Sequence, residues 1–206
     1  MEIGLSMSNK DIHLLLKELK MKAEDDDVPI MQDEGINFLT NFILKNKINS
    51  VLEIGTAVGY SAIVMALTNP NLKITSIERD EERYLEALKN VKAFDLEERI
   101  TLIFNDALDV SISDKFELIF LDGAKGKNIE FFEKFKKNVS MPGYIITDNI
   151  SFHGMVEKDE NNIKSRNLRG LVRKIKSYIR YLKDNGEYNT KFHDVGDGIS
   201  VTEINK

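Results

Sequence analysis

The sequence contains no cysteine and only three histidines. Without cysteine the protein can form no disulfide, no thiolate nucleophile and no cysteine–zinc site, so we expect it in the reducing cytoplasm. The histidines, His13, His153 and His193, do not have the HExxH spacing of a zinc hydrolase. A histidine-rich zinc site is therefore not expected.

Long apolar runs are also missing. No stretch approaches the ~20 residues that a membrane helix needs, and the N-terminus lacks the basic start and unbroken apolar core of a signal peptide, so we expect no membrane partner. Hydrophobic residues make up 42% of the chain and charged residues 31%, which is typical of a folded globular protein. The length of 206 residues predicts one domain over 1–206, with a helical cap at 1–46 and an α/β core at 47–206.

Charge is distributed unevenly along the chain. The net charge is −5, but residues 158–183 hold nine lysines and arginines against two carboxylates, so this segment is +7 and the remainder is −12. Such an asymmetry often marks an interaction surface.

The apolar pattern changes its period after the first 46 residues. Helical spacing predicts two helices, at 9–22 and 32–45, and the acidic run at 24–27 is expected to end the first one in a loop. Short apolar runs then alternate with helical stretches at 61–67, 81–94, 129–138 and 166–183, which predicts βαβ units and a parallel sheet. A hairpin closes the chain, with its turn at 196–198. The expected strands are 50–54, 73–77, 100–104, 118–121, 144–147, 191–195 and 199–204.

Ligands of open α/β sheets bind at the carboxyl ends of the strands, and the residues there suggest a nucleoside cofactor. Gly55 and Gly59 permit a tight turn with close backbone approach, and the acidic Glu53 just before them suits a cofactor that carries an amine. Glu78 follows the next strand at the distance typical of a ribose-binding carboxylate, although it can equally cap a helix. Residues 105–107 (Asn-Asp-Ala) lie where an adenine edge would bind.

Acidic and amide side chains follow the next two strands. Asp122 comes after one, and Asp148 and Asn149 come after its neighbour. Two carboxylates and an amide carbonyl form an all-oxygen ligand set of the kind that Mg²⁺ prefers. Each residue taken alone also fits a helix cap or the start of a polar loop.

Several motifs together resemble one family. VLEIGTAVGYSA, ITSIERD, FNDA, FLDGAK and TDN resemble the class I S-adenosylmethionine-dependent methyltransferases, and more narrowly the metal-dependent O-methyltransferases of the catechol and caffeoyl-CoA type. The resemblance implies an α/β, Rossmann-like class I fold with a mostly parallel seven-stranded sheet, N-terminal helices and a C-terminal antiparallel hairpin. It also implies S-adenosylmethionine and Mg²⁺ as cofactors, and we expect a homodimer.

The resemblance also assigns roles to single residues. Lys125 matches the catalytic lysine. Asp122, Asp148 and Asn149 match the metal ligands, and Asp122 would in addition take part in the catalytic step and contact the cofactor. A surface lysine is the alternative for Lys125. The positions that match cofactor contacts are Met31, Glu53, Gly55, Ser61, Glu78, Asp106, Ala107 and Asp122.

The acceptor is left open by these motifs. Among bacterial members the chain most resembles the tRNA 5-hydroxyuridine methyltransferases, whose acceptor would be the wobble position of a tRNA anticodon loop. Arg166, Arg169 and Arg173 lie on a basic stripe of the helix expected at 166–183, where they would bind the tRNA backbone or simply be solvated. His153 would line the substrate entrance or have no role. The alternatives are a small catechol or acyl-CoA acceptor, a non-catalytic S-adenosylmethionine-binding protein and, remotely, a nicotinamide dehydrogenase.

Overall fold

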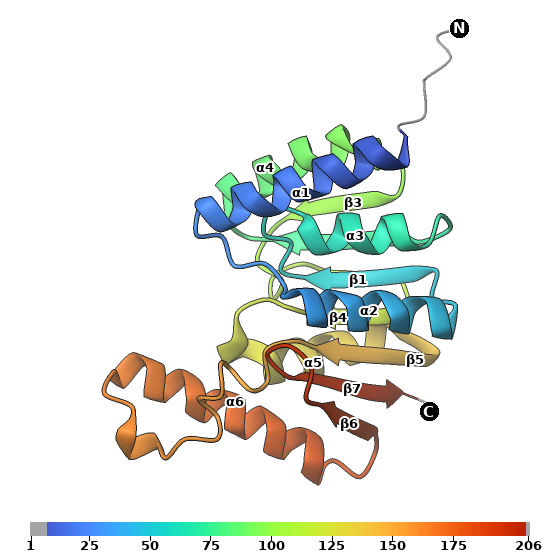
Figure 1. Ribbon diagram of the computed structural model, residues 1–206. Coiled ribbons are helices and arrows are strands. Elements are labelled where there is room, and N and C mark those ends of the chain that lie inside the picture. The colour runs from blue at the N-terminus through green and yellow to red at the C-terminus, as the bar shows by residue number, and fades with distance from the viewer. Residues whose placement is uncertain (1–7, 205–206) are drawn as a thin grey trace, which may run out of the picture.

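A seven-stranded sheet lies at the centre of the computed structural model, which describes residues 8–204 (Figure 1). The strand order is β3-β2-β1-β4-β5-β7-β6; β7 runs antiparallel to both β5 and β6, whereas the other neighbours are parallel. This confirms the predicted fold class. The strands are β1 (Ser50–Ile54), β2 (Lys73–Glu78), β3 (Ile100–Phe104), β4 (Phe116–Leu121), β5 (Val139–Thr147), β6 (Asn189–His193) and β7 (Ile199–Ile204).

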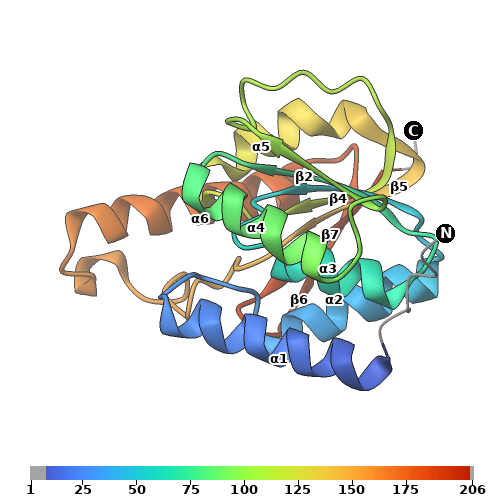
Figure 2. The ribbon, with the colours of Figure 1, turned by 90° about the horizontal axis from the view of Figure 1, so that it is seen from above.

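Helices cover both faces of the sheet, α1 to α4 on one side and α5 and α6 on the other (Figure 2). The described helices are α1 (Asn9–Asp25), α2 (Asp33–Asn46), α3 (Tyr60–Thr68), α4 (Glu81–Ala93), α5 (Asn128–Phe135) and α6 (Arg166–Asp184), with short 3₁₀ turns η1 (Lys125–Lys127), η2 (Lys136–Asn138) and η3 (Glu160–Asn162). None of the helices within residues 8–204 has the length and apolarity required to cross a bilayer.

The strands are apolar because both of their faces are buried. Successive side chains of β1 enter opposite cores: Val51 packs with the α1–α4 layer and Leu52 with the α5–α6 layer. Parallel strands covered by helices on both faces read as continuous apolar runs, and this is why their positions could be predicted closely.

Several predicted boundaries are wrong. The largest error is at the start of β5, which begins at Val139 and not at residue 144, and β4 begins at Phe116 and not at residue 118. The helix at 9–22 extends to Asp25, because Glu24 and Asp25 continue its backbone and the chain turns only at Asp27, where φ is +52°. The last three residues of the helix expected at 129–138 form η2 instead. Strand β6 ends at His193 and not at residue 195, so the connection to β7 is longer than the predicted turn.

The parallel register brings the ends of the central strands to one edge of the sheet. Ile54 of β1 lies beside Leu121 of β4, and Leu121 lies beside Thr147 of β5. The residues that follow these strands are therefore neighbours in space although they are far apart in the sequence.

Candidate active site

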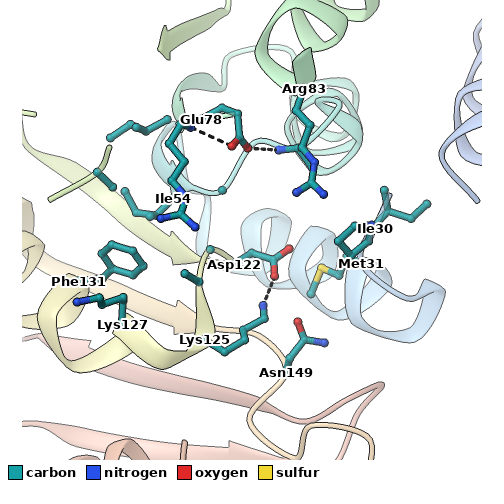
Figure 3. A pocket seen from close by; sticks show the side chains of 18 of the residues that line it. Ile30, Met31, Ile54, Glu78, Arg83, Asp122, Lys125, Lys127, Phe131 and Asn149 are labelled. Atoms are coloured by element: carbon teal, nitrogen blue, oxygen red, sulfur yellow. Dashed lines mark hydrogen bonds and ion pairs between the residues drawn. The ribbon is translucent and has the colours of Figure 1, made fainter. Parts of the chain in front are cut away.

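A cavity of about 520 Å³ opens at this edge of the sheet (Figure 3). Its volume lies within the range of small-molecule sites, roughly 300–1,000 Å³. The structure brings most of the predicted site residues together in its lining. Those that line it are Met31, Gly55, Glu78, Asp106, Ala107, Asp122, Lys125 and Asn149.

Gly55 lets two segments of backbone pack together more closely than a residue with a Cβ would allow. Its φ is +104°, and a Cβ at this position would lie 2.7 Å from the backbone oxygen of Asp122. The chain after β1 therefore passes against the chain after β4 without an intervening side chain. A ligand can approach the backbone closely here, as a cofactor cradle requires.

Glu78 presents a fixed carboxylate to the cavity. Its Oε2 accepts a hydrogen bond from the backbone N–H of Ala57 at 2.8 Å, and its Oε1 accepts from those of Arg79 and Asp80, both at 2.9 Å. Only 7% of the residue is exposed. These donors hold the carboxylate without neutralising it with a cation, so its oxygens can accept further bonds from a vicinal diol.

Asp106 lies at the next strand end, beside Arg79, to which the sequence motifs assign no role. Its Oδ1 accepts from the backbone N–H of Leu108 at 2.8 Å, and its Oδ2 lies 3.6 Å from Nη1 of Arg79. Arg79 lines the cavity together with Arg83. This end of the cavity thus combines acidic and basic groups around the predicted adenine position.

Glu53 and Ser61 lie behind the cavity wall and not in its lining. The carboxylate of Glu53 is fully buried and accepts hydrogen bonds from the hydroxyls of Ser61 and Ser76, each at 2.5 Å. Burial raises the pKa of Glu53 to about 8, against the opposing effect of the two serine donors. Direct contact of these two residues with a cofactor stays a prediction.

Asp122 and Lys125 form an ion pair in the cavity. Nζ of Lys125 lies 2.5 Å from Oδ1 of Asp122, and the two side chains are each 17% exposed. Asp122 follows the end of β4, and Lys125 begins the 3₁₀ turn η1 three residues later. The two side chains point toward each other in the cavity (Figure 3). Lys125 is therefore part of the cavity and not a surface lysine.

Asp148 and Asn149 follow β5 and differ in their exposure. Asn149 lines the cavity, whereas Asp148 is 3% exposed and lies outside the lining. Burial, together with the neighbouring carboxylate of Asp122, raises the pKa of Asp148 to about 7. An additional cation near this pair would favour the ionised form of Asp148.

The predicted magnesium ligands fit such an ion by their chemistry. Asp122, Asp148 and Asn149 bring hard oxygen donors to adjacent strand ends, and the crowded carboxylates favour a positive charge between them. The ammonium of Lys125 forms an ion pair with one of these ligands, Asp122. Within residues 8–204, no three histidine, aspartate or glutamate side chains converge as a metal cage.

Two further residues line the cavity. His153 lies in the lining, as its predicted place at the substrate entrance requires, and whether it has a role stays a prediction; Asp197 lines the cavity from the connection before β7. The sequence pattern predicts only a hairpin turn at Asp197, and the glycines on either side of it are the one local signal of an unusual backbone. Its carboxylate contacts both Asn149 and His153.

A family model described as O-methyltransferase matches residues 5–203. The chain belongs to the O-methyltransferase family.

Relatives of this O-methyltransferase cover nearly its whole length. A protein of Arabidopsis thaliana provisionally named caffeoyl-CoA O-methyltransferase is 30% identical over 202 residues, which is 92% of this chain and 85% of the relative. A crystal structure of a Staphylococcus aureus protein with the same provisional name superimposes with a TM-score of 0.87 at 31% identity, over 92% of this chain and 91% of that one.

A second solved structure shares the fold of the O-methyltransferase. The O-methyltransferase from Bacillus cereus, solved in complex with SAH, has a TM-score of 0.79 at 21% identity, over 98% of this chain and 93% of that one. Together these matches show that the chain is an S-adenosylmethionine-dependent O-methyltransferase with the class I fold.

The three arginines predicted to bind tRNA lie on α6 of the O-methyltransferase, outside the cavity lining. Nε and Nη2 of Arg169 donate to the backbone oxygen of Ile163 at 3.2 and 3.0 Å, and Nε of Arg173 lies 2.6 Å from Oε2 of Glu160. Arg166 is exposed in the first turn. Two of the three arginines thus have partners within the chain, and their role in RNA binding stays a prediction.

Proposed function

We propose that this O-methyltransferase transfers the methyl group of S-adenosylmethionine, with Mg²⁺ as cofactor, to one hydroxyl of a small catechol-like acceptor. The observation that supports the proposal is a single cavity that joins a cofactor half to an acceptor half. Gly55 and Glu78 form the first half, and Asp122, Lys125 and Asn149 form the second.

The cofactor half suits an adenosine with a free ribose diol. Glu78 would accept hydrogen bonds from the two hydroxyls, and Gly55 allows the cofactor to lie against the backbone. Asp106 and Ala107 would contact the adenine, with the guanidinium of Arg79 beside them. Met31, buried at 4% exposure, would close the cavity from the segment before α2.

The acceptor half suits two adjacent oxygens. Asp122, Asp148 and Asn149 would hold Mg²⁺, which when bound lowers the pKa of an acceptor hydroxyl and orients it. Lys125 is placed to accept the hydroxyl proton at Nζ once that nitrogen is neutral. The acceptor oxygen then forms its bond to the methyl carbon as the carbon–sulfur bond breaks, and the sulfur keeps that electron pair.

A small acceptor is favoured over tRNA by the relatives and by α6. Two relatives that are 30% and 31% identical to this chain carry names that refer to caffeoyl-CoA, whose ring bears two adjacent hydroxyls. Glu160 already pairs with Arg173 and Lys176, so part of the basic stripe is neutralised within the chain.

The wobble 5-hydroxyuridine of tRNA is the second candidate acceptor, and one observation favours it. Helix α6 packs beside η1, and a Cβ on Gly126 would lie 3.2 Å from Cδ of Lys174, so the cationic helix runs next to Lys125. The 5-hydroxyl and 4-carbonyl of this base are also adjacent oxygens. The homodimer stays a prediction under either acceptor.

An acceptor comparison tests the proposal. The protein is incubated with labelled S-adenosylmethionine, Mg²⁺ and, separately, catechol, caffeoyl-CoA or tRNA that carries 5-hydroxyuridine. We expect a methylated small molecule and no gain of 5-methoxyuridine by nucleoside analysis. Methylation of the tRNA alone would overturn the small-acceptor proposal and support the second candidate.

A further inference from the structure

A buried carboxylate outside the predicted ligand set holds the loop that carries Asn149. Asp197 lies in the connection between β6 and β7, and only 6% of it is exposed. Residues 149–153 wrap around it. An unpaired buried carboxylate would lower the stability of the fold. The hydrogen-bond partners of Asp197 therefore indicate which part of the chain it stabilises.

The partners of Asp197 all come from this one loop. Its Oδ2 accepts from Nδ2 of Asn149 at 3.1 Å and lies 3.4 Å from Nδ1 of His153. Its Oδ1 accepts from the backbone N–H of His153. Its backbone oxygen accepts from the N–H of Ser151 at 2.9 Å, and the oxygen of Gly198 accepts from the N–H of Ile150 at 3.0 Å.

The loop needs these contacts because its backbone is strained. Asn149, Phe152 and His153 have φ values of +58°, +46° and +53°, in the left-handed region that residues with a Cβ rarely adopt. Residues in this region carry a conformational cost and persist only where the surrounding contacts hold them there. Two of the three, Asn149 and His153, are bound directly by the carboxylate of Asp197.

The same contacts determine which way the amide of Asn149 faces. A carboxylate oxygen only accepts hydrogen bonds, so the NH₂ group of Asn149 must be the one that faces Asp197. Its Oδ1 therefore points away from Asp197. Figure 3 shows this oxygen directed into the cavity, toward Lys125 and Asp122.

We propose that Asp197 is a positioning residue that holds the strained loop 149–153 and turns the amide oxygen of Asn149 into the cavity as a ligand for the divalent ion. The metal role of Asn149 rests on the proposed function, whereas the hold on the loop stands on the contacts alone. Partners that orient metal ligands typically contribute 10- to 100-fold to metal affinity.

The test compares Asp197→Asn with a matched control, Asp194→Asn. Asp194 belongs to the same connection, is exposed and does not line the cavity. The replacement at 197 keeps the shape of the side chain but exchanges one of its two acceptor oxygens for an NH₂ donor, so the side chain cannot accept from both Asn149 and His153. Mn²⁺ affinity is measured by calorimetry with S-adenosylhomocysteine present, and hydrogen exchange of the 149–154 amides is measured without metal, both well below the melting temperature.

We expect Asp197→Asn to weaken Mn²⁺ binding about 10- to 100-fold and to speed amide exchange at His153 and Ser151, with Asp194→Asn like the wild type. A lower melting temperature with unchanged Mn²⁺ affinity would overturn the positioning role and leave only a structural one. If the wild type binds no Mn²⁺, the proposed function fails; unchanged loop exchange in Asp197→Asn would by itself contradict the hold on the loop.

Discussion

Replacing Asp148 with asparagine is expected to abolish methyl transfer and, at the same time, to stabilise the fold above neutral pH. The loss of activity should reach about 1,000-fold, since the change removes a charged metal ligand and each 1.4 kcal/mol of transition-state stabilisation is tenfold in rate. The amide keeps the size of the side chain. Binding of S-adenosylhomocysteine should be nearly unchanged, because Asp148 does not line the cavity.

The gain in stability follows from the raised pKa. Burial moves the pKa of Asp148 from 3.8 to about 7 in the folded protein, so between these values the folded state binds more protons than the unfolded one. The free energy of unfolding of the wild type therefore falls as the pH rises through this window. Asp148→Asn lacks that titration and should be more stable than the wild type at about pH 8, by roughly 1–3 kcal/mol.

Thermal unfolding at about pH 4 and pH 8, together with turnover at pH 8, distinguishes a functional role from a structural one. The matched control is Asp114→Asn, an exposed aspartate that should leave both the stability and the rate unchanged. An Asp148→Asn protein that retains wild-type turnover would contradict the assignment of Asp148 as a ligand. One that unfolds more easily at pH 8 would show that the carboxylate is needed for the fold.

Replacing Glu78 with alanine is expected to weaken binding of S-adenosylhomocysteine by about 10- to 150-fold. This range corresponds to the loss of a charge-assisted hydrogen bond, about 1.5–3 kcal/mol. The carboxylate is held by three backbone N–H groups and faces the cavity, so it needs no rearrangement to accept from a ribose diol. Glu78→Gln should bind with intermediate affinity, because one acceptor oxygen remains.

Calorimetry on the folded proteins measures this effect, with Glu82→Ala as the matched control. Glu82 is an exposed carboxylate in the first turn of the adjacent α4 and does not line the cavity. Equal affinities of the wild type, Glu78→Ala and Glu82→Ala would show that Glu78 only caps the turn after β2.

Residues at strand ends were predictable from the sequence because parallel topology brings them together. Gly55, Glu78 and Asp122 each follow an apolar run, and the sheet order puts their strands side by side. The glycine pattern and the DGAK and DN motifs predict which side chains form the site, and the parallel topology predicts that these side chains lie close together.

Other parts of the site depend on contacts that no local pattern contains. Asp197 meets Asn149 only because β7 inserts between β5 and β6, and the hairpin alone does not indicate this. Glu53 occupies a strand position that the pleat turns away from the cavity, toward Ser61. The basic stripe on α6 predicted the position of Arg173 but not its pairing with Glu160, which belongs to the 3₁₀ turn η3 before the helix.

Methyl transfer by this O-methyltransferase is expected to require a divalent ion held by its oxygen donors. The most direct measurement is the rate of methyl transfer to a catechol acceptor in metal-free buffer, with and without added Mg²⁺, next to the affinity for S-adenosylhomocysteine under both conditions. We expect negligible transfer without metal, recovery when Mg²⁺ is returned, and cofactor binding that barely changes. Full transfer in chelator by a protein that binds the cofactor normally would contradict this metal requirement.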